Sequence, residues 1–139
     1  MPLVNFGSIL SFAEELEKQE LSFYSDAALN EACLAYSELF SGFAQEAQRN
    51  IKTIQRTRRE NVTEMILENI QGFTRDPYCL ECGPAAEMDA AEVLETARKL
   101  EERSARYYTD AADKLKAQRE VARALKLIGK KHISRQSKI

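Results

Sequence analysis

The sequence is poor in the residues that end helices or cross-link a chain. Its 139 residues include only five glycines and three prolines. So little turn-forming material favours long helices over many short strands. Three cysteines are too few, and odd in number, for a disulfide framework. Cys33 lies within a helical pattern, where we expect it to be a small buried hydrophobic residue.

The sequence also lacks the signs of membrane insertion and of secretion. No run approaches the roughly 18 apolar residues that a membrane span needs. No basic segment followed by an apolar one opens the sequence, as it does in a signal peptide. We therefore expect a cytoplasmic protein that does not associate with a membrane.

The net charge of −2 excludes no class of partner by itself. A short basic run spans residues 49–59, and further basic residues gather toward the C-terminus, at Lys114, Lys116, Arg119, Arg123, Lys126, Lys130, Lys131, Arg135 and Lys138. No aromatic residues interleave with the second group, and no nucleic-acid recognition motif is visible. We expect these residues to form a solvated face that complements acidic helices, and we do not expect nucleic-acid binding.

The length and composition are those of one ordinary domain, residues 1–139, with 44% hydrophobic and 30% charged residues. Ser8, Asn30 and Asp89 are suitable helix N-caps. Apolar residues between 62 and 70 continue at helical spacing, as an extension of the second helix or as a separate short one. The helical spacing predicts four long helices, at about 8–29, 30–58, 91–115 and 117–134.

One stretch of the sequence occurs twice. Residues 13–28, AEELEKQELSFYSDAA, are matched 84 positions later by residues 97–112, ARKLEERSARYYTDAA. Seven of the sixteen positions are identical, where unrelated helices would share about one or two. The identical pairs are Ala13/Ala97, Leu16/Leu100, Glu17/Glu101, Tyr24/Tyr108, Asp26/Asp110, Ala27/Ala111 and Ala28/Ala112. Most of the matched positions follow the spacing of one helix face, so we expect Glu17 and Glu101 to point inward.

The second and fourth helices correspond as well, at an offset of 82 positions. The pairs are Phe43/Leu125, Ala47/Gly129, Asn50/His132 and Ile51/Ile133. Two helical hairpins of similar design, joined by an irregular crossover segment at residues 72–86, predict an all-α four-helix bundle.

An inward carboxylate in each half is costly unless a cation or a hydrogen-bond donor meets it. Some four-helix bundles use such glutamates to hold two iron ions. The motifs LEKQELSFY and LEERSARYY, and KLIGKKHIS in the last helix, resemble the rubrerythrin branch of the ferritin-like superfamily. The resemblance covers residues 12–134 and implies a ferritin-like four-helix bundle with Glu17, Glu101 and His132 as metal ligands. Glu20 and Glu46 are candidate replacements for further carboxylates.

The resemblance also implies the chemistry of the site. It implies iron, with manganese or zinc as alternatives, together with a redox or peroxide-handling role and a separate electron-donor protein. Three positions depart from the family's pattern: Gly129 stands where a glutamate is expected, and Ala47 and Asn50 stand where a glutamate and a histidine are expected.

These departures favour a second interpretation, in which the bundle keeps its architecture without the chemistry. Glu17 and Glu101 would then pair with Arg49, Lys131 or His132, and Tyr24 and Tyr108 would donate hydrogen bonds to them. The protein would serve as an interaction or assembly protein.

The crossover segment contains a second candidate site, Cys79-Leu80-Glu81-Cys82, followed by Gly83. Two thiolates at this spacing can bind zinc or iron. The remaining ligands would come from a second subunit, in a homodimer, or from His132. A redox dithiol and incidental cysteines are the other interpretations.

Overall fold

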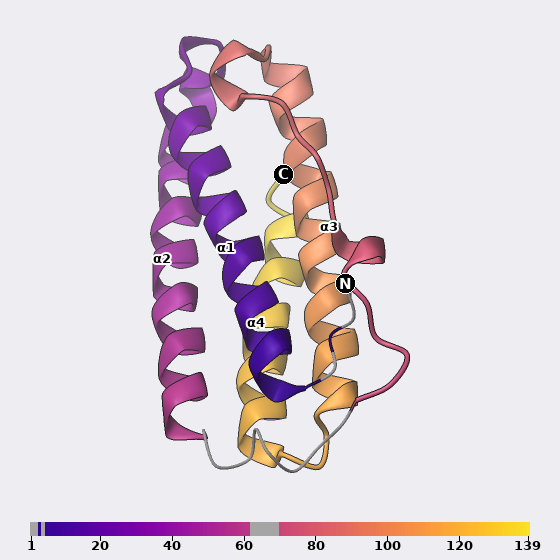
Figure 1. Ribbon diagram of the computed structural model, residues 1–139. Coiled ribbons are helices and arrows are strands. Elements are labelled where there is room, and N and C mark those ends of the chain that lie inside the picture. The colour runs from indigo at the N-terminus through magenta and orange to yellow at the C-terminus, as the bar shows by residue number, and fades with distance from the viewer. Residues whose placement is uncertain (1–2, 4, 62–69) are drawn as a thin grey trace.

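The computed structural model describes residue 3, residues 5–61 and residues 70–139 (Figure 1). The all-α fold expected from the sequence is confirmed. Short 3-10 helices lie before α2 and in the crossover segment. The elements are α1 (Phe6–Leu29), η1 (Glu31–Tyr36), α2 (Ser37–Glu60), η3 (Asp76–Tyr78), η4 (Ala85–Glu87), α3 (Ala90–Lys114) and α4 (Arg119–Gln136).

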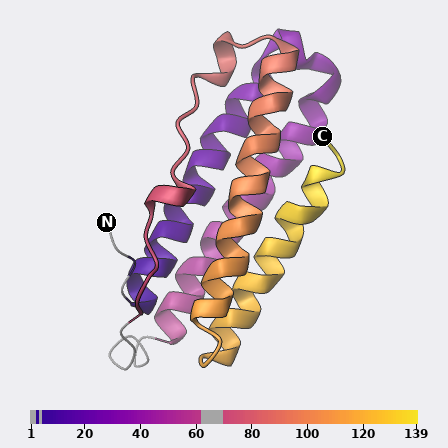
Figure 2. The ribbon, with the colours of Figure 1, turned by 90° about the vertical axis from the view of Figure 1, so that its right-hand side faces the viewer.

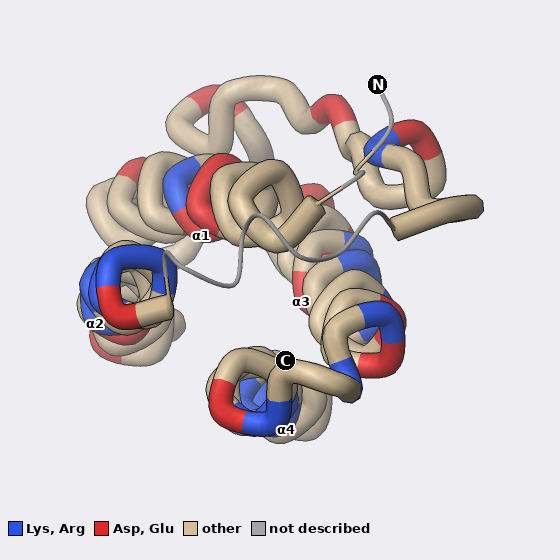
Figure 3. The backbone as a smooth tube through the Cα atoms, turned by 60° about the horizontal axis from the view of Figure 1, so that its bottom comes forward, with Lys and Arg blue, Asp and Glu red and all other residues tan. Residues whose placement is uncertain are grey.

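The four long helices form two hairpins around a common core. α1 packs mainly against α2, and α3 packs mainly against α4. The crossover segment runs back along the bundle, so α3 starts at the end where α1 finishes (Figures 1 and 2). Seen obliquely from one end, α1 lies between α2 and α3, and α4 closes the bundle opposite α1 (Figure 3). This arrangement brings the repeated helices α1 and α3 side by side.

The helix ends agree with the sequence in two of three places. Asp89 caps α3 by accepting the N–H of Glu92, and Asn30 ends α1 and caps η1. The predicted cap Ser8 is wrong, because α1 begins three residues earlier. Asn5 is the cap: its side chain accepts the N–H of Ser8 at 2.8 Å, and the Ser8 hydroxyl accepts the N–H of Asn5 at 3.2 Å.

The second predicted helix is divided. The 3-10 helix η1, which has non-helical dihedral angles at Cys33, precedes α2, and α2 starts at Ser37 after its N-cap Tyr36 and not at Asn30. Cys33 is buried, as expected. The predicted helical continuation from residue 62 lies almost entirely outside the described residues.

The buried residues form two apolar clusters separated by a polar layer. One cluster includes Phe6, Ile9, Leu10, Tyr107, Leu115 and Leu125, and the other includes Phe23, Phe40, Phe43, Val93 and Leu100. The polar layer contains fully or almost fully buried charged side chains at Glu17, Glu20, Glu101, His132 and Arg135. The candidate site is thus inside the bundle, with apolar packing on both sides.

The crossover segment is fastened to the outside of α1 and α3. The Tyr78 hydroxyl donates to Asp110 at 2.5 Å, Gln19 donates to the carbonyl of Leu80 at 2.6 Å, and Arg106 donates to a crossover carbonyl. No helix in the part of the chain that the structure describes is both long and apolar enough to cross a membrane.

Candidate metal centre

Three helices contribute the charged groups at the centre of the polar layer. Glu17 and Glu20 lie one turn apart on α1, Glu101 lies on α3 and His132 lies on α4. All four side chains are 0% exposed. The expectation that Glu17 and Glu101 point into the bundle is confirmed.

His132 links the glutamates of the two repeats. Its Nε2 atom lies 2.8 Å from Glu17 Oε2, and its Nδ1 atom lies 2.6 Å from Glu101 Oε1. The imidazole ring is stacked on the ring of Tyr108, with the centroids 5.3 Å apart and the planes at 11°. The ring orientation is therefore fixed by contacts at both nitrogens and on one face.

The repeat also produces a reciprocal pair of hydrogen bonds. Tyr24 of the first repeat donates to Glu101 at 2.6 Å, and Tyr108 of the second repeat donates to Glu17 at 2.7 Å. Burial and the neighbouring carboxylates raise the pKa of both tyrosines well above 10.0. Both hydroxyls therefore remain proton donors at neutral pH.

The glutamates of the cluster differ in their protonation. Burial, together with the charge of Glu101, raises the pKa of Glu20 well above 4.5. Burial also disfavours the ionised form of Glu101, but hydrogen bonds from Glu20 and His132 and the charges of His132 and Arg135 lower its pKa to about 2. Burial also disfavours the ionised form of Glu17, but its pKa is lowered, chiefly by the charge of His132 and the hydrogen bond with it.

The same charges act on the histidine. Burial disfavours imidazolium, but Glu20, Glu17 and Glu101 outweigh burial and raise the pKa of His132 well above 6.5. The cluster therefore favours a protonated His132 between the ionised Glu17 and Glu101, and Glu20 keeps its proton to a higher pH than an ordinary glutamate because its pKa is raised.

Arg135 is a charged residue of the polar layer whose burial the sequence did not indicate. It was expected on a solvated basic face, but its side chain is 1% exposed and reaches into the polar layer. Its Nη2 atom donates to Glu46 at 2.7 Å, and Nη1 lies 3.3 Å from Glu20 and 3.4 Å from Glu101. The available signal was its position three residues after His132, which puts both side chains on the same helix face.

The prediction of which cations pair with the buried glutamates is correct only in part. His132 takes this role, as one of the expected alternatives. Arg49 and Lys131 are exposed on the surface, and Arg135 replaces them. Glu46 reaches inward only as far as Arg135, and its side chain is 29% exposed.

The three positions that depart from the family's pattern make other contacts in the structure. Ala47 is buried and offers no donor atom, and Asn50 donates to Glu17 at 3.1 Å. At Gly129, a Cβ atom would lie 3.0 Å from Cβ of Tyr108, so a glutamate there would displace the ring that stacks on His132. None of these three positions supplies a carboxylate or an imidazole to the polar layer.

A smaller donor set does come together. Glu17, Glu20 and His132 each offer a ligand atom, and these atoms lie within 4.8 Å of one another. The Oδ1 atom of Asn50 is buried beside this group and has no hydrogen-bond partner among the described residues. This group can hold a metal ion, and its oxygen and imidazole donors suit iron, manganese or zinc.

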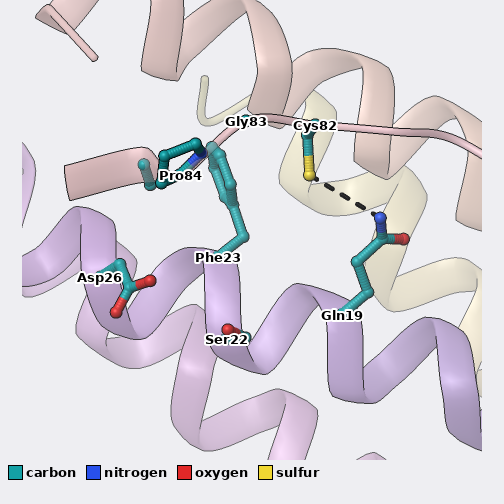
Figure 4. Close-up of a pocket in the computed structure, with 8 residues that line it drawn as sticks. Gln19, Ser22, Phe23, Asp26, Cys82, Gly83 and Pro84 are labelled. Atoms are coloured by element: carbon teal, nitrogen blue, oxygen red, sulfur yellow. Dashed lines mark hydrogen bonds between the residues drawn. The ribbon is translucent and has the colours of Figure 1, made fainter. Parts of the chain in front are cut away.

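The cysteines of the crossover segment lie apart from this cluster. Cys79 is exposed, and Cys82 is half-buried and points toward α1, where its Sγ atom lies 3.7 Å from Gln19 Nε2 (Figure 4). Both are free thiols, and burial raises the pKa of Cys82 above 9.0. His132 is not a third ligand for them, because both of its nitrogens face glutamates in the core.

The bundle and its buried glutamate and histidine cluster define the class of this protein as a ferritin-like helical bundle. In agreement, the sequence model of the family described as "Ferritin-like domain" matches residues 7–132. The chain belongs to this family. No curated protein and no solved structure gives a significant match to the chain.

Proposed function

We propose that this protein binds a single metal ion, iron or manganese in preference to zinc, through Glu17, Glu20 and His132. The observation that carries the proposal is the convergence of three donor atoms within 4.8 Å in a fully buried site. The unpartnered Oδ1 of Asn50 supports it, because a buried polar atom without a partner is costly unless a ligand or a water meets it. Two carboxylates and one imidazole favour a hard or borderline cation.

The surrounding residues would hold the ligands in place. Glu101 is positioned to accept the Nδ1–H of His132, which would leave Nε2, next to Glu17, as the ligand atom. Tyr108 and Asn50 each donate to Glu17, so its carboxylate cannot rotate freely. These contacts make Glu101 an orienting residue, and Glu17, Glu20 and His132 the direct ligands.

We further propose a redox role of the peroxide-handling kind, following the resemblance to rubrerythrins. A redox-active ion in this site would supply electron transfer to an oxidant such as a peroxide. The hydroxyls of Tyr24 and Tyr108 would keep protons next to the two ionised glutamates, because their pKa values lie well above 10.0. The apolar clusters above and below the polar layer would restrict water.

The proposal is tested by metal analysis of protein purified without chelators and without a nickel column. We expect about one equivalent of iron or manganese per chain, and its loss in Glu17→Gln and in His132→Gln. Glu95→Gln is the matched control, since Glu95 lies on the surface of α3 with its side chain 69% exposed. Metal-free wild-type protein that also binds no added Fe²⁺ or Mn²⁺ would contradict the proposal.

A second function is favoured by one observation. The positive charges of His132 and Arg135 already balance the ionised glutamates, so the bundle satisfies its buried charges from its own residues. A non-catalytic interaction or assembly protein would need nothing more. In that case the core of the wild-type protein binds no metal, and added Fe²⁺ or Mn²⁺ does not change the thermal stability; a structural metal at Cys79 and Cys82 would remain compatible with this function.

A further inference from the structure

Three carboxyl groups from three helices converge on the guanidinium group of Arg135. Glu20 comes from α1, Glu46 from α2 and Glu101 from α3. Arg135 Nη1 lies 3.3 Å from Glu20 Oε1 and 3.4 Å from both oxygens of Glu101, and Nη2 lies 2.7 Å from Glu46 Oε1. The same guanidinium lies 5.2 Å from the centre of the Phe43 ring. A buried cation thus occupies a cage of acidic and aromatic side chains.

The register of α1 and α4 places this cage next to the proposed metal ligands. Glu17 and Glu20 are three residues apart on α1, and His132 and Arg135 are three residues apart on α4. Glu17 contacts His132 at 2.8 Å, and Glu20 contacts Arg135 at 3.3 Å. The core therefore has two positions for a cation, one beside the Glu17–His132 pair and one beside the Glu20–Arg135 pair.

We propose that Arg135 occupies the second of these positions and thereby limits the bundle to one metal ion. The guanidinium is permanently charged and donates in several directions at once, so it neutralises the carboxylates that a second ion would need. Without it, Glu20, Glu46 and Glu101 form a latent site of three carboxylates. Oxygen donors of this kind bind divalent cations such as Mn²⁺.

Glu46 is the most exposed of the three carboxylates of the latent site. Its side chain is 29% exposed, whereas Glu20 and Glu101 are 0% exposed. Glu46 is therefore the ligand from whose side we expect a divalent cation to enter.

The test is the number of Mn²⁺ ions bound per chain, measured by titration calorimetry and by electron paramagnetic resonance of free Mn²⁺. Arg135→Met removes the charge while keeping an unbranched side chain, and Arg135→Lys keeps a charge. Arg123→Met is the matched control, because Arg123 is an exposed arginine on the same helix. We expect one more Mn²⁺ in Arg135→Met than in wild type, and no additional ion in Arg135→Lys or Arg123→Met.

Removing one carboxylate tests the composition of the latent site. The double variant Glu46→Gln/Arg135→Met should lose the additional ion, with an affinity for it at least tenfold weaker. If Arg135→Met folds and binds the same number of ions as wild type, the inference is wrong. If Arg135→Met unfolds without metal, we expect Mn²⁺ to restore its helical circular dichroism, and failure of millimolar Mn²⁺ to do so also overturns it.

The inference concerns the same core as the proposed function but fails separately from it. Wild-type protein that binds no ion, together with an Arg135→Met variant that binds one through Glu46, contradicts the proposed function and supports the role of Arg135. One ion in both proteins supports the proposed function and contradicts the role of Arg135.

Discussion

Every ionised side chain of the polar layer has a partner that carries the opposite charge or donates a hydrogen bond. Glu17 is met by His132, Tyr108 and Asn50, and Glu101 is met by His132, Tyr24 and Arg135. Buried charges without such partners would be several kcal/mol too costly for a domain of this size. Single substitutions in this layer should therefore affect stability more strongly than their size suggests.

The reciprocal tyrosines give the first prediction at this scale. Tyr108→Phe removes a hydrogen bond to the ionised Glu17, and Tyr24→Phe removes one to the ionised Glu101. We expect each variant to lose about 1.5–3 kcal/mol of the free energy of unfolding, the range for hydrogen bonds to charged groups. Urea unfolding followed by circular dichroism measures this loss.

Tyr36→Phe is the control for these variants, because Tyr36 lies partly exposed outside the polar layer and should change little. Equal stability of wild type, Tyr24→Phe and Tyr108→Phe would show that the two carboxylates do not depend on these donors.

The protonation of Glu20 and His132 gives the second prediction. Both residues keep their protons to a higher pH than an ordinary glutamate and histidine do, since burial and Glu101 raise the pKa of Glu20 and the neighbouring glutamates raise the pKa of His132. A metal ion needs both in the deprotonated form, so binding must release protons and become tighter as the pH rises. We expect the affinity for Mn²⁺ to increase steadily from roughly pH 6 to 8.

Calorimetry in buffers with different ionisation enthalpies counts the protons released by Mn²⁺ binding. We expect between one and two per ion. An affinity that does not vary with pH, with no proton release, would mean that the ion binds elsewhere or that these two groups are not protonated.

At the scale of the helices, the repeat made four buried polar residues of the site predictable. Glu17, Tyr24, Glu101 and Tyr108 are identical pairs at matching positions of a helical face that recurs in the sequence, and a repeated polar residue on an inward face is a local signal. The reciprocal bonding of these residues across the α1–α3 interface follows from that symmetry.

Local sequence patterns of this kind did not predict the burial of Arg135 on α4. Arg135 belongs to a run of basic residues whose spacing fits a solvated helix face, and nothing within the run distinguishes it from Lys131 or Lys138. Its burial depends on how α4 is rotated against α1 and α2, which is a property of the assembled bundle. Only its spacing from His132, three residues, relates it to the site.

The helix start at Asn5 was missed for a related reason. Asn5 and Ser8 are both good capping residues, and the sequence alone does not show which of them lies at the N-cap. In the structure they act together, since each side chain accepts the other's backbone N–H.

At the scale of the whole molecule, the crossover segment holds an exposed thiol, Cys79, and a half-buried thiol, Cys82, next to the bundle. Gln19 of α1 connects the crossover to α3: it donates to the carbonyl of Leu80 and accepts from Arg103, a buried residue of α3. Cys79 and Cys82 therefore sit on a fixed surface, which suits a site shared between two copies of the chain.

This arrangement gives the last prediction, a zinc-dependent homodimer. Two thiolates from each chain would complete the four-coordinate sulfur site that Zn²⁺ prefers. We expect one Zn²⁺ per two chains and a doubling of the 15.8 kDa mass in light scattering after size-exclusion chromatography.

Cys79→Ser should abolish both, while Cys33→Ser, which changes a buried cysteine of the core, should leave them intact. A mass of one chain at saturating Zn²⁺ would exclude the shared site. α1 contacts both the crossover segment and the polar layer, so binding at one site could affect the other. Dimer formation and occupancy of the core site are therefore measured on the same sample. If each is unchanged when the other is lost, the two metal sites are independent.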